Sequence, residues 1–201
     1  AAKGAGVEVT QAVVSTSRRW SDGTYLGLTY SHYAFPEIER DEFLPVTDAE
    51  LADDHAERFA LAGVKPLSTR WRANVDLGAW IDEDDDGANG ELGFVIDDAL
   101  VEGGALELAG FADKGRFTST VGGRCSYGHT SGSARWHVDY EFARHLFEGF
   151  GSDNNELPQH RLRASWDWTT ESGWSASLHV EGQLFDDETG YTAGFYVQRS
   201  F

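Results

Sequence analysis

The chain has 201 residues, with 34 Asp and Glu against 16 Lys and Arg, so its formal net charge is −18 at pH 7. This charge argues against direct binding to nucleic-acid phosphates, and the single cysteine, Cys125, excludes an intrachain disulfide. The chain has no run of 18 or more apolar residues, which excludes a membrane-spanning helix. The acidity is typical of a salt-tolerant protein or of one that meets divalent cations.

Eleven segments alternate apolar and polar residues with a period of two, which predicts β-strands with two different faces. In chain order they cover residues 7–18, 24–34, 56–65, 70–82, 91–98, 104–112, 116–127, 134–142, 161–168, 174–181 and 190–201. The clearest is 70–82, where Trp71, Val75 and Leu77 fall on one face and Arg70, Arg72 and Asp76 on the other. A short helix is expected over 48–59. The length predicts a single domain over residues 1–201.

The expected connections alternate in length. Short turns near 20–24, 65–68, 102–104, 129–133 and 170–173 are separated by longer or more acidic loops at 36–55, 83–90, 147–158 and 186–189. Short turns at one end and long loops at the other indicate an all-β, antiparallel, up-and-down transmembrane barrel. A soluble sandwich or jelly roll predicts the same alternation and remains the alternative. Because bacterial single-chain barrels have even strand counts, eleven means either a miscount by one or the C-terminal part of a larger barrel.

The polar faces of these strands predict a charged lumen, with tryptophans at both strand ends of the opposite face as an interfacial girdle. The predicted lumen residues are Arg70, Arg72, Arg135, Asp139, Glu141, Arg161, Arg163, His179 and Glu181. They would form either an ion-selecting constriction or a salt-bridged plug. Trp71, Trp136 and Trp166 are expected to face lipid.

The last segment, 190–201, places Tyr191, Phe195, Val197 and the final Phe201 on one face, with Arg199 departing from the pattern. It resembles the terminal strand of bacterial outer-membrane barrels, which carries their assembly signal. The resemblance implies an outer-membrane location and contact with membrane lipid, lipopolysaccharide and the barrel-assembly machinery. The implied role is that of a porin-like pore for transport, an exporter subunit or a structural surface protein. The solute and the oligomeric state stay open.

The same segment also resembles the closing strand of alginate-lyase-type jelly rolls, through Tyr191, Ala193, Gly194, Tyr196 and Gln198. The two other motifs of that family are matched only in part. Thr69-Arg70-Trp71-Arg72 lacks the Glu, and Trp136-His137-Val138 lacks the Gln. This resemblance implies a periplasmic or secreted enzyme or binding protein for acidic polysaccharide. Its substrate groove would hold Arg72, His137, Tyr191, Tyr196 and Gln198.

The segment 82–87 places Asp82, Asp84 and Asp86 before Gly87, the first half of an oxygen-ligand calcium loop. The twelfth position is Gly93, so the bidentate glutamate of such loops is missing. The interpretations are a weak Ca²⁺ site, a bridge to lipopolysaccharide phosphates, or an acidic solvated loop. No other cofactor is expected.

Overall fold

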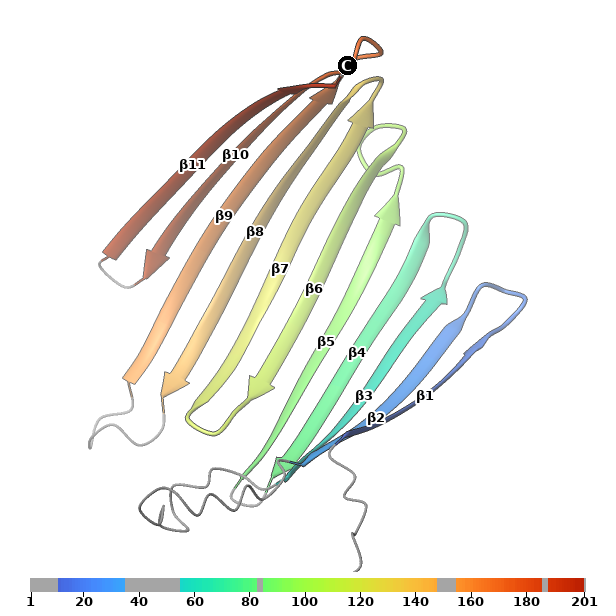
Figure 1. Cartoon of the computed structure of the whole chain (residues 1–201), viewed down its shortest axis with the longest axis vertical. Coiled ribbons are helices and arrows are strands. Elements are labelled where there is room, and N and C mark those ends of the chain that lie inside the picture. Colours follow the sequence, from blue (N-terminus) through green and yellow to red (C-terminus); the bar gives the residue numbers. More distant parts are fainter. Residues whose placement is uncertain (1–10, 35–54, 83–84, 148–154, 186–187, 201) are drawn as a thin grey trace, which may run out of the picture.

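The structure is a computed structural model that describes residues 11–34, 55–82, 85–147, 155–185 and 188–200. All the regular structure in these ranges is β-strand (Figure 1). In chain order the strands are β1 (Gln11–Arg19), β2 (Tyr25–Ala34), β3 (His55–Pro66), β4 (Trp71–Asp82), β5 (Asp86–Asp97), β6 (Gly104–Lys114), β7 (Thr118–Ser131), β8 (Ala134–Phe147), β9 (Asn155–Thr169), β10 (Trp174–Phe185) and β11 (Glu188–Arg199). The described residues include no helix that is long and apolar enough to cross a membrane.

The strands form one sheet in which spatial order equals chain order, from β1 to β11. Each neighbouring pair is antiparallel, so the all-β, up-and-down prediction is confirmed. A jelly roll needs Greek-key connections between two sheets, and this order has none among the described strands. The sheet is strongly curved and stays open, with β1 and β11 as its two edges (Figure 1).

Each of the eleven predicted strands is present, but several are longer than the alternation indicated. β5 begins at Asp86 rather than near residue 91, because Gly87 and Gly90 still pair with β4 although glycine carries no alternation signal. β9 begins at Asn155, inside a predicted loop. The helix expected over 48–59 is wrong for residues 55–59, which belong to β3; residues 48–54 lie outside the described ranges, as do residues 7–10 of the first predicted strand.

The two ends of the sheet differ. The connections after β1, β3, β5, β7 and β9 are short, described turns at one end, and β11 also finishes there (Figure 1). We call this the short-turn end and the opposite one the loop end. The expected alternation in connection length is confirmed only in part, because three connections at the loop end, 83–85, 115–117 and 186–187, are short too. Four turn glycines with positive φ lie at the short-turn end: Gly23, Gly103, Gly132 and Gly173. Glycine reaches this conformation without the steric cost that a Cβ brings, which explains its place in these tight turns.

Candidate functional site: the polar face of the sheet

Residues that are directly opposite in a ladder point to the same side of a sheet, so the register divides the strands into two faces. One face, here called the apolar face, includes Leu28, Leu61, Leu77, Leu92, Leu108, Tyr140, Leu162, Leu178 and Phe195. The other, here called the polar face, includes Arg58, Arg72, Asp76, Glu91, Glu107, Arg124, Asp139, Glu141, Arg161, Arg163 and Glu181.

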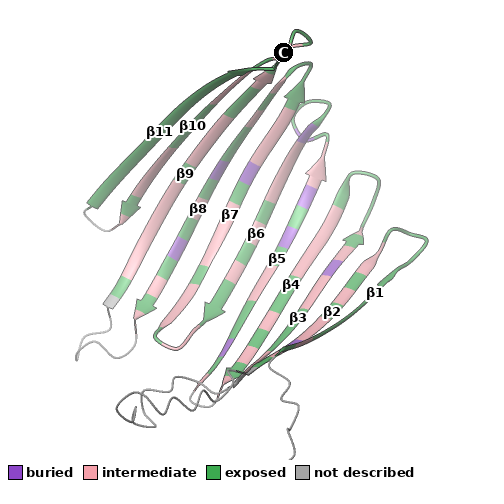
Figure 2. Ribbon diagram, in the orientation of Figure 1, coloured by how far each residue is buried: buried purple, intermediate pink, exposed green. Residues whose placement is uncertain are grey.

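Burial is inverted relative to a water-soluble sheet. On the apolar face Leu77 is 50% exposed and Leu92 52% exposed, whereas Asp139 on the polar face is only 3% exposed. The few buried residues are scattered over β2, β3, β5, β6, β7 and β8 and the turn between β5 and β6, and β11 is exposed along its whole length (Figure 2). A contiguous apolar surface of this extent marks an interaction with a membrane or with another apolar partner.

Ion pairs between neighbouring strands cover part of the polar face. Nε of Arg163 on β9 donates to Oδ1 of Asp139 on β8 at 2.8 Å, and the two residues are direct register partners. Two positions further along the same strand pair, Arg161 donates to Glu141 at 2.6 Å. Cross-strand pairs of opposite charge stabilise a sheet, and pairs hydrogen-bonded by a guanidinium are the stronger ones.

The network continues through β7, β6 and β5. Arg124 donates to Glu91 at 2.7 Å, reaching across β6, and its Nη2 also lies 3.5 Å from Glu107. Nearer the short-turn end, Arg72 pairs with Asp97 at 3.0 Å. A belt of ion-paired charges therefore crosses the polar face from β5 to β9 at mid-height, in two groups that meet where Arg124 lies opposite Glu141 in the ladder.

The predicted lumen residues share this face with one exception. Arg70 lies in the turn before β4, at the short-turn end. Arg135 lines a hollow of about 420 Å³ together with His137 and Asp167, and His179 lies 3.8 Å from Glu181 on the same strand. That the face lines a lumen stays a prediction.

Sequence reasoning missed four members of the network: Glu91, Asp97, Glu107 and Arg124. They belong to segments where glycine and alanine interrupt the alternation, such as Gly122 and Gly123 beside Arg124. Counting in steps of two from Ser126 or Gly128 would have placed Arg124 on the polar face.

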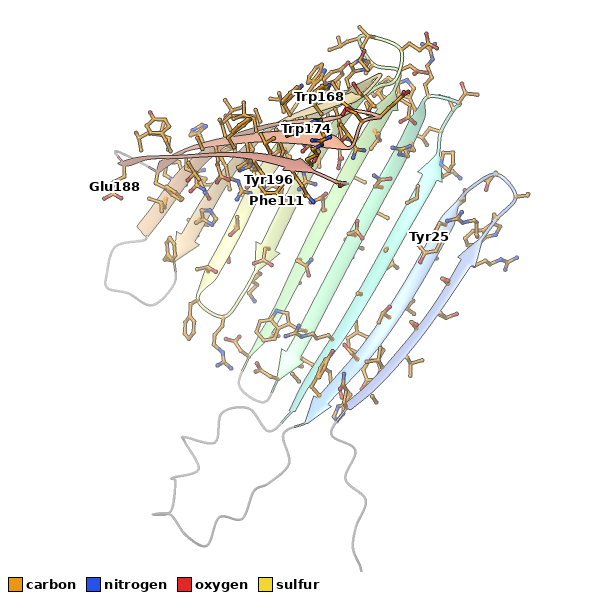
Figure 3. The ribbon with its side chains drawn as sticks, turned by 45° about the horizontal axis from the view of Figure 1, so that its top comes forward. Tyr25, Phe111, Trp168, Trp174, Glu188 and Tyr196 are labelled. Carbon is orange, nitrogen blue, oxygen red and sulfur yellow. The ribbon has the colours of Figure 1, made fainter. Side chains whose placement is uncertain are left out.

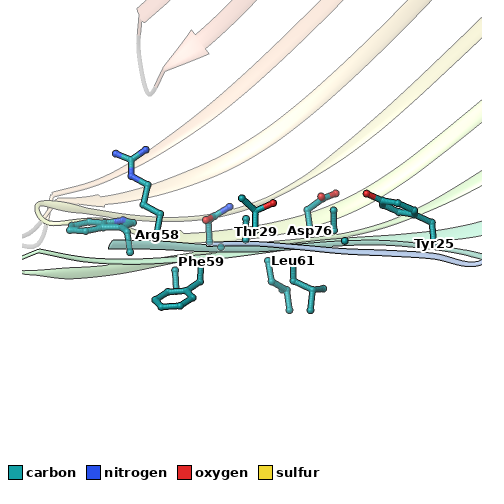
Figure 4. A pocket seen from close by; sticks show the side chains of 14 residues that line it. Tyr25, Thr29, Arg58, Phe59, Leu61 and Asp76 are labelled. Atoms are coloured by element: carbon teal, nitrogen blue, oxygen red, sulfur yellow. The ribbon is translucent and has the colours of Figure 1, made fainter. Parts of the chain in front are cut away.

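A second hollow, of about 510 Å³, lies over β2, β3 and β4. Its floor is made of short side chains, among them Thr29, Ala60, Ala62 and Gly78. Tyr25, Thr29, Arg58 and Asp76 point to one side of the sheet here, and Phe59 and Leu61 to the other (Figure 4). At mid-height the polar face is thus crowded over β5–β9 and open over β2–β4, whereas the hollow beside Arg135 lies nearer the short-turn end.

Tryptophans on the apolar face gather at the short-turn end. They are Trp71, Trp136, Trp166, Trp168 and Trp174, and the last two flank the turn between β9 and β10 (Figure 3). The prediction that tryptophans mark both strand ends of this face is wrong for the described residues, since Trp80, near the loop end, lies on the polar face opposite Arg58. The guanidinium of Arg199, the residue that departs from the terminal-strand pattern, lies 5.3 Å from the ring of Trp174, a cation–π contact.

The proposed polysaccharide groove does not come together on one face. Tyr191 pairs with Gly182 and lies on the apolar face, whereas Tyr196 and Gln198 lie on the polar face, where the Tyr196 hydroxyl donates to Gln198 at 2.9 Å. Arg72 and His137 are on the polar face too. Two faces of one sheet cannot line one groove.

The described carboxylates of the acidic turn between β4 and β5 lie close to basic side chains. Oδ1 of Asp82 accepts the backbone N–H of Asp85 at 2.7 Å and lies 3.2 Å from Arg116, and Asp86 lies 3.7 Å from Lys114. Asp82 and Asp86 point to opposite faces, and Asp84 lies outside the described residues. No group of three metal-ligating side chains occurs in the described ranges. Calcium binding here stays a prediction.

These features define the class: an all-β protein built from one up-and-down antiparallel sheet with a charged face and an apolar face. No protein-family model matches the chain. No curated protein matches it either.

Proposed function

We propose that the chain is part of a transmembrane β-barrel of the bacterial outer membrane, with the apolar face toward lipid and the polar face lining a water-filled lumen, and that it acts as a pore. The observation that carries this proposal is the inverted burial, with half-exposed leucines on one face and a nearly buried Asp139 on the other. In water such a surface would be costly, whereas in a bilayer it is the stable arrangement.

Three further features support the proposal. Strands of 9 to 15 residues are long enough to cross a bilayer at the usual tilt, which takes about 9–11 residues. The tryptophans at the short-turn end lie where an aromatic girdle would meet one membrane interface. Short turns at one end are typical of the periplasmic side of such barrels.

Closure of a barrel requires the two sheet edges to be joined. Eleven strands in alternating directions leave β1 and β11 parallel, so they would join directly only through a parallel ladder. An odd number of added strands gives an antiparallel ladder throughout, and even totals are the rule in bacterial single-chain barrels. We therefore favour a larger barrel of which this sheet is a part.

The proposal also fixes the expected partners. The terminal strand presents Tyr191, Phe195 and Val197 on the apolar face, as a segment recognised by the barrel-assembly machinery would; Phe201 lies outside the described residues. Membrane lipid would contact this face, and lipopolysaccharide would surround the loop end.

The test is the electrophoretic mobility of the detergent-extracted protein in SDS, with and without boiling. A closed barrel resists SDS until it is heated, so a heat-dependent shift is expected. A protein that shows no shift and stays in solution without detergent would overturn the proposal.

A further inference from the structure

At mid-height the polar face is open over β2, β3 and β4, and the charge around this opening is not balanced. This opening is the 510 Å³ hollow over β2, β3 and β4, floored by Thr29, Ala60, Ala62 and Gly78. Across the sheet from it, the side chains of Arg124, Arg161 and Arg163 fill the face and are tied down by ion pairs. Water and ions would therefore pass over β2–β4, where the wall is hollow at mid-height.

Asp76 is the carboxylate of this hollow. Its register partners are Ala62 on β3 and Glu91 on β5, so neither neighbour offers a positive charge. Arg58 carries the guanidinium of the hollow. It lies opposite Trp80, which is four residues beyond Asp76 on β4, and its guanidinium is 5.9 Å from the ring of Tyr33. Within the described ranges no ion pair or hydrogen bond reaches the Asp76 side chain.

The neighbouring charges do not cancel Asp76. Arg124 is shared between Glu91 and Glu107, at 2.7 and 3.5 Å. With Arg58 counted, three carboxylates (Asp76, Glu91 and Glu107) therefore face two guanidiniums on this part of the wall, which leaves one negative charge in excess. A low-dielectric wall lined by one sign of charge concentrates counter-ions in front of it.

Resting on the proposed pore function, we infer that the permeating solutes are small inorganic cations and that they pass over β2–β4 beside Asp76. The ion-pair belt over β5–β9 is the rigid side of the passage. The hollow is the conducting side, and Asp76 supplies its uncompensated charge.

The experiment is the reversal potential of the native, membrane-extracted protein in a planar bilayer under a KCl gradient. The wild type is expected to favour K⁺ over Cl⁻. Asp76→Asn should lower the permeability ratio by about an order of magnitude, because one charge at roughly 5 Å in water changes the local concentration of an ion about fourfold and acts in opposite directions on K⁺ and Cl⁻. Thr29→Glu, which adds a carboxylate to the same hollow, should raise the ratio. The matched control is Glu171→Gln, in the turn after β9, which should leave the ratio unchanged.

Each variant is first checked for the heat-dependent shift in SDS, which separates the two levels of the proposal. If the wild type shows no heat-dependent shift, the proposed pore function itself is overturned. A heat-shifting, conducting protein that prefers Cl⁻, or whose ratio is the same in Asp76→Asn and Thr29→Glu, would overturn only the cation path over β2–β4.

Discussion

Replacing Leu77 by Arg tests the orientation of the sheet most directly. Leu77 lies in the middle of β4 on the apolar face, opposite Leu61, and is 50% exposed. If lipid covers this face, an arginine near the bilayer midplane should destabilise the folded state by about 2–4 kcal/mol. That is roughly a 30- to 900-fold loss in the folding equilibrium. On a water-exposed face the same change should stay within about 0.5 kcal/mol.

The depth dependence makes the prediction sharper. Arginine at Ala73, Val75, Leu77 and Ala79, which all lie on the apolar face of β4, should give a cost that peaks in the middle and falls to about 0–1 kcal/mol toward the membrane interfaces. The matched control is Ala60→Arg, on the polar face over the hollow, where the new side chain has room and water. Urea titration of the protein folded in lipid vesicles measures each free energy. A flat profile, or an equal cost for Ala60→Arg, would refute the assignment of the faces.

Three further predictions concern an ion pair and three turns at the short-turn end. Arg163→Met should lower the free energy of unfolding by about 1–3 kcal/mol, because it leaves the nearly buried Asp139 carboxylate without its donor. Adding Asp139→Asn should recover part of this loss. Urea titrations in which the two substitutions have strictly additive effects would argue against coupling. The Asp22 carboxylate accepts the backbone N–H two residues on at 2.9 Å, which lowers its pKa below the ordinary 3.8. This contribution to turn stability is present above pH 3.8 and is lost as the pH falls through the lowered folded value, so amide protection there should drop in acid for the wild type and stay level in Asp22→Asn. Gly173→Ala should destabilise the protein more than Gly132→Ala, although both glycines have positive φ. The Cβ added at Gly173 would lie 2.6 Å from the backbone oxygen of Ser200, whereas nothing lies within 4 Å of a Cβ at Gly132. Equal free energies of unfolding for the two variants would contradict this.

The sequence was sufficient to predict which residues share a face. Alternation depends only on the two-residue period of a strand, so Arg72, Asp139 and Arg163 could be assigned to one face without a structure. Strand ends were predicted less well, because Gly87 and Gly90 make ladder bonds without a side chain that signals them.

The ion pairs themselves were beyond sequence reasoning. Arg124 meets Glu91, 33 residues earlier in the chain, only because β5, β6 and β7 stand in a particular register. The open hollow was missed for a related reason. It depends on small residues from three strands, Thr29, Ala62 and Gly78, lying side by side, and each of them alone carries no signal.

The identity between chain order and sheet order has a consequence for how the protein folds. Every backbone ladder among the described strands joins two strands that follow one another in the chain. Little loop-closure entropy opposes any one pairing, so hairpins can be added one after another and the search is short for an all-β topology. A defect in one strand should then delay the two ladders beside it and leave distant hairpins to form at their own rate.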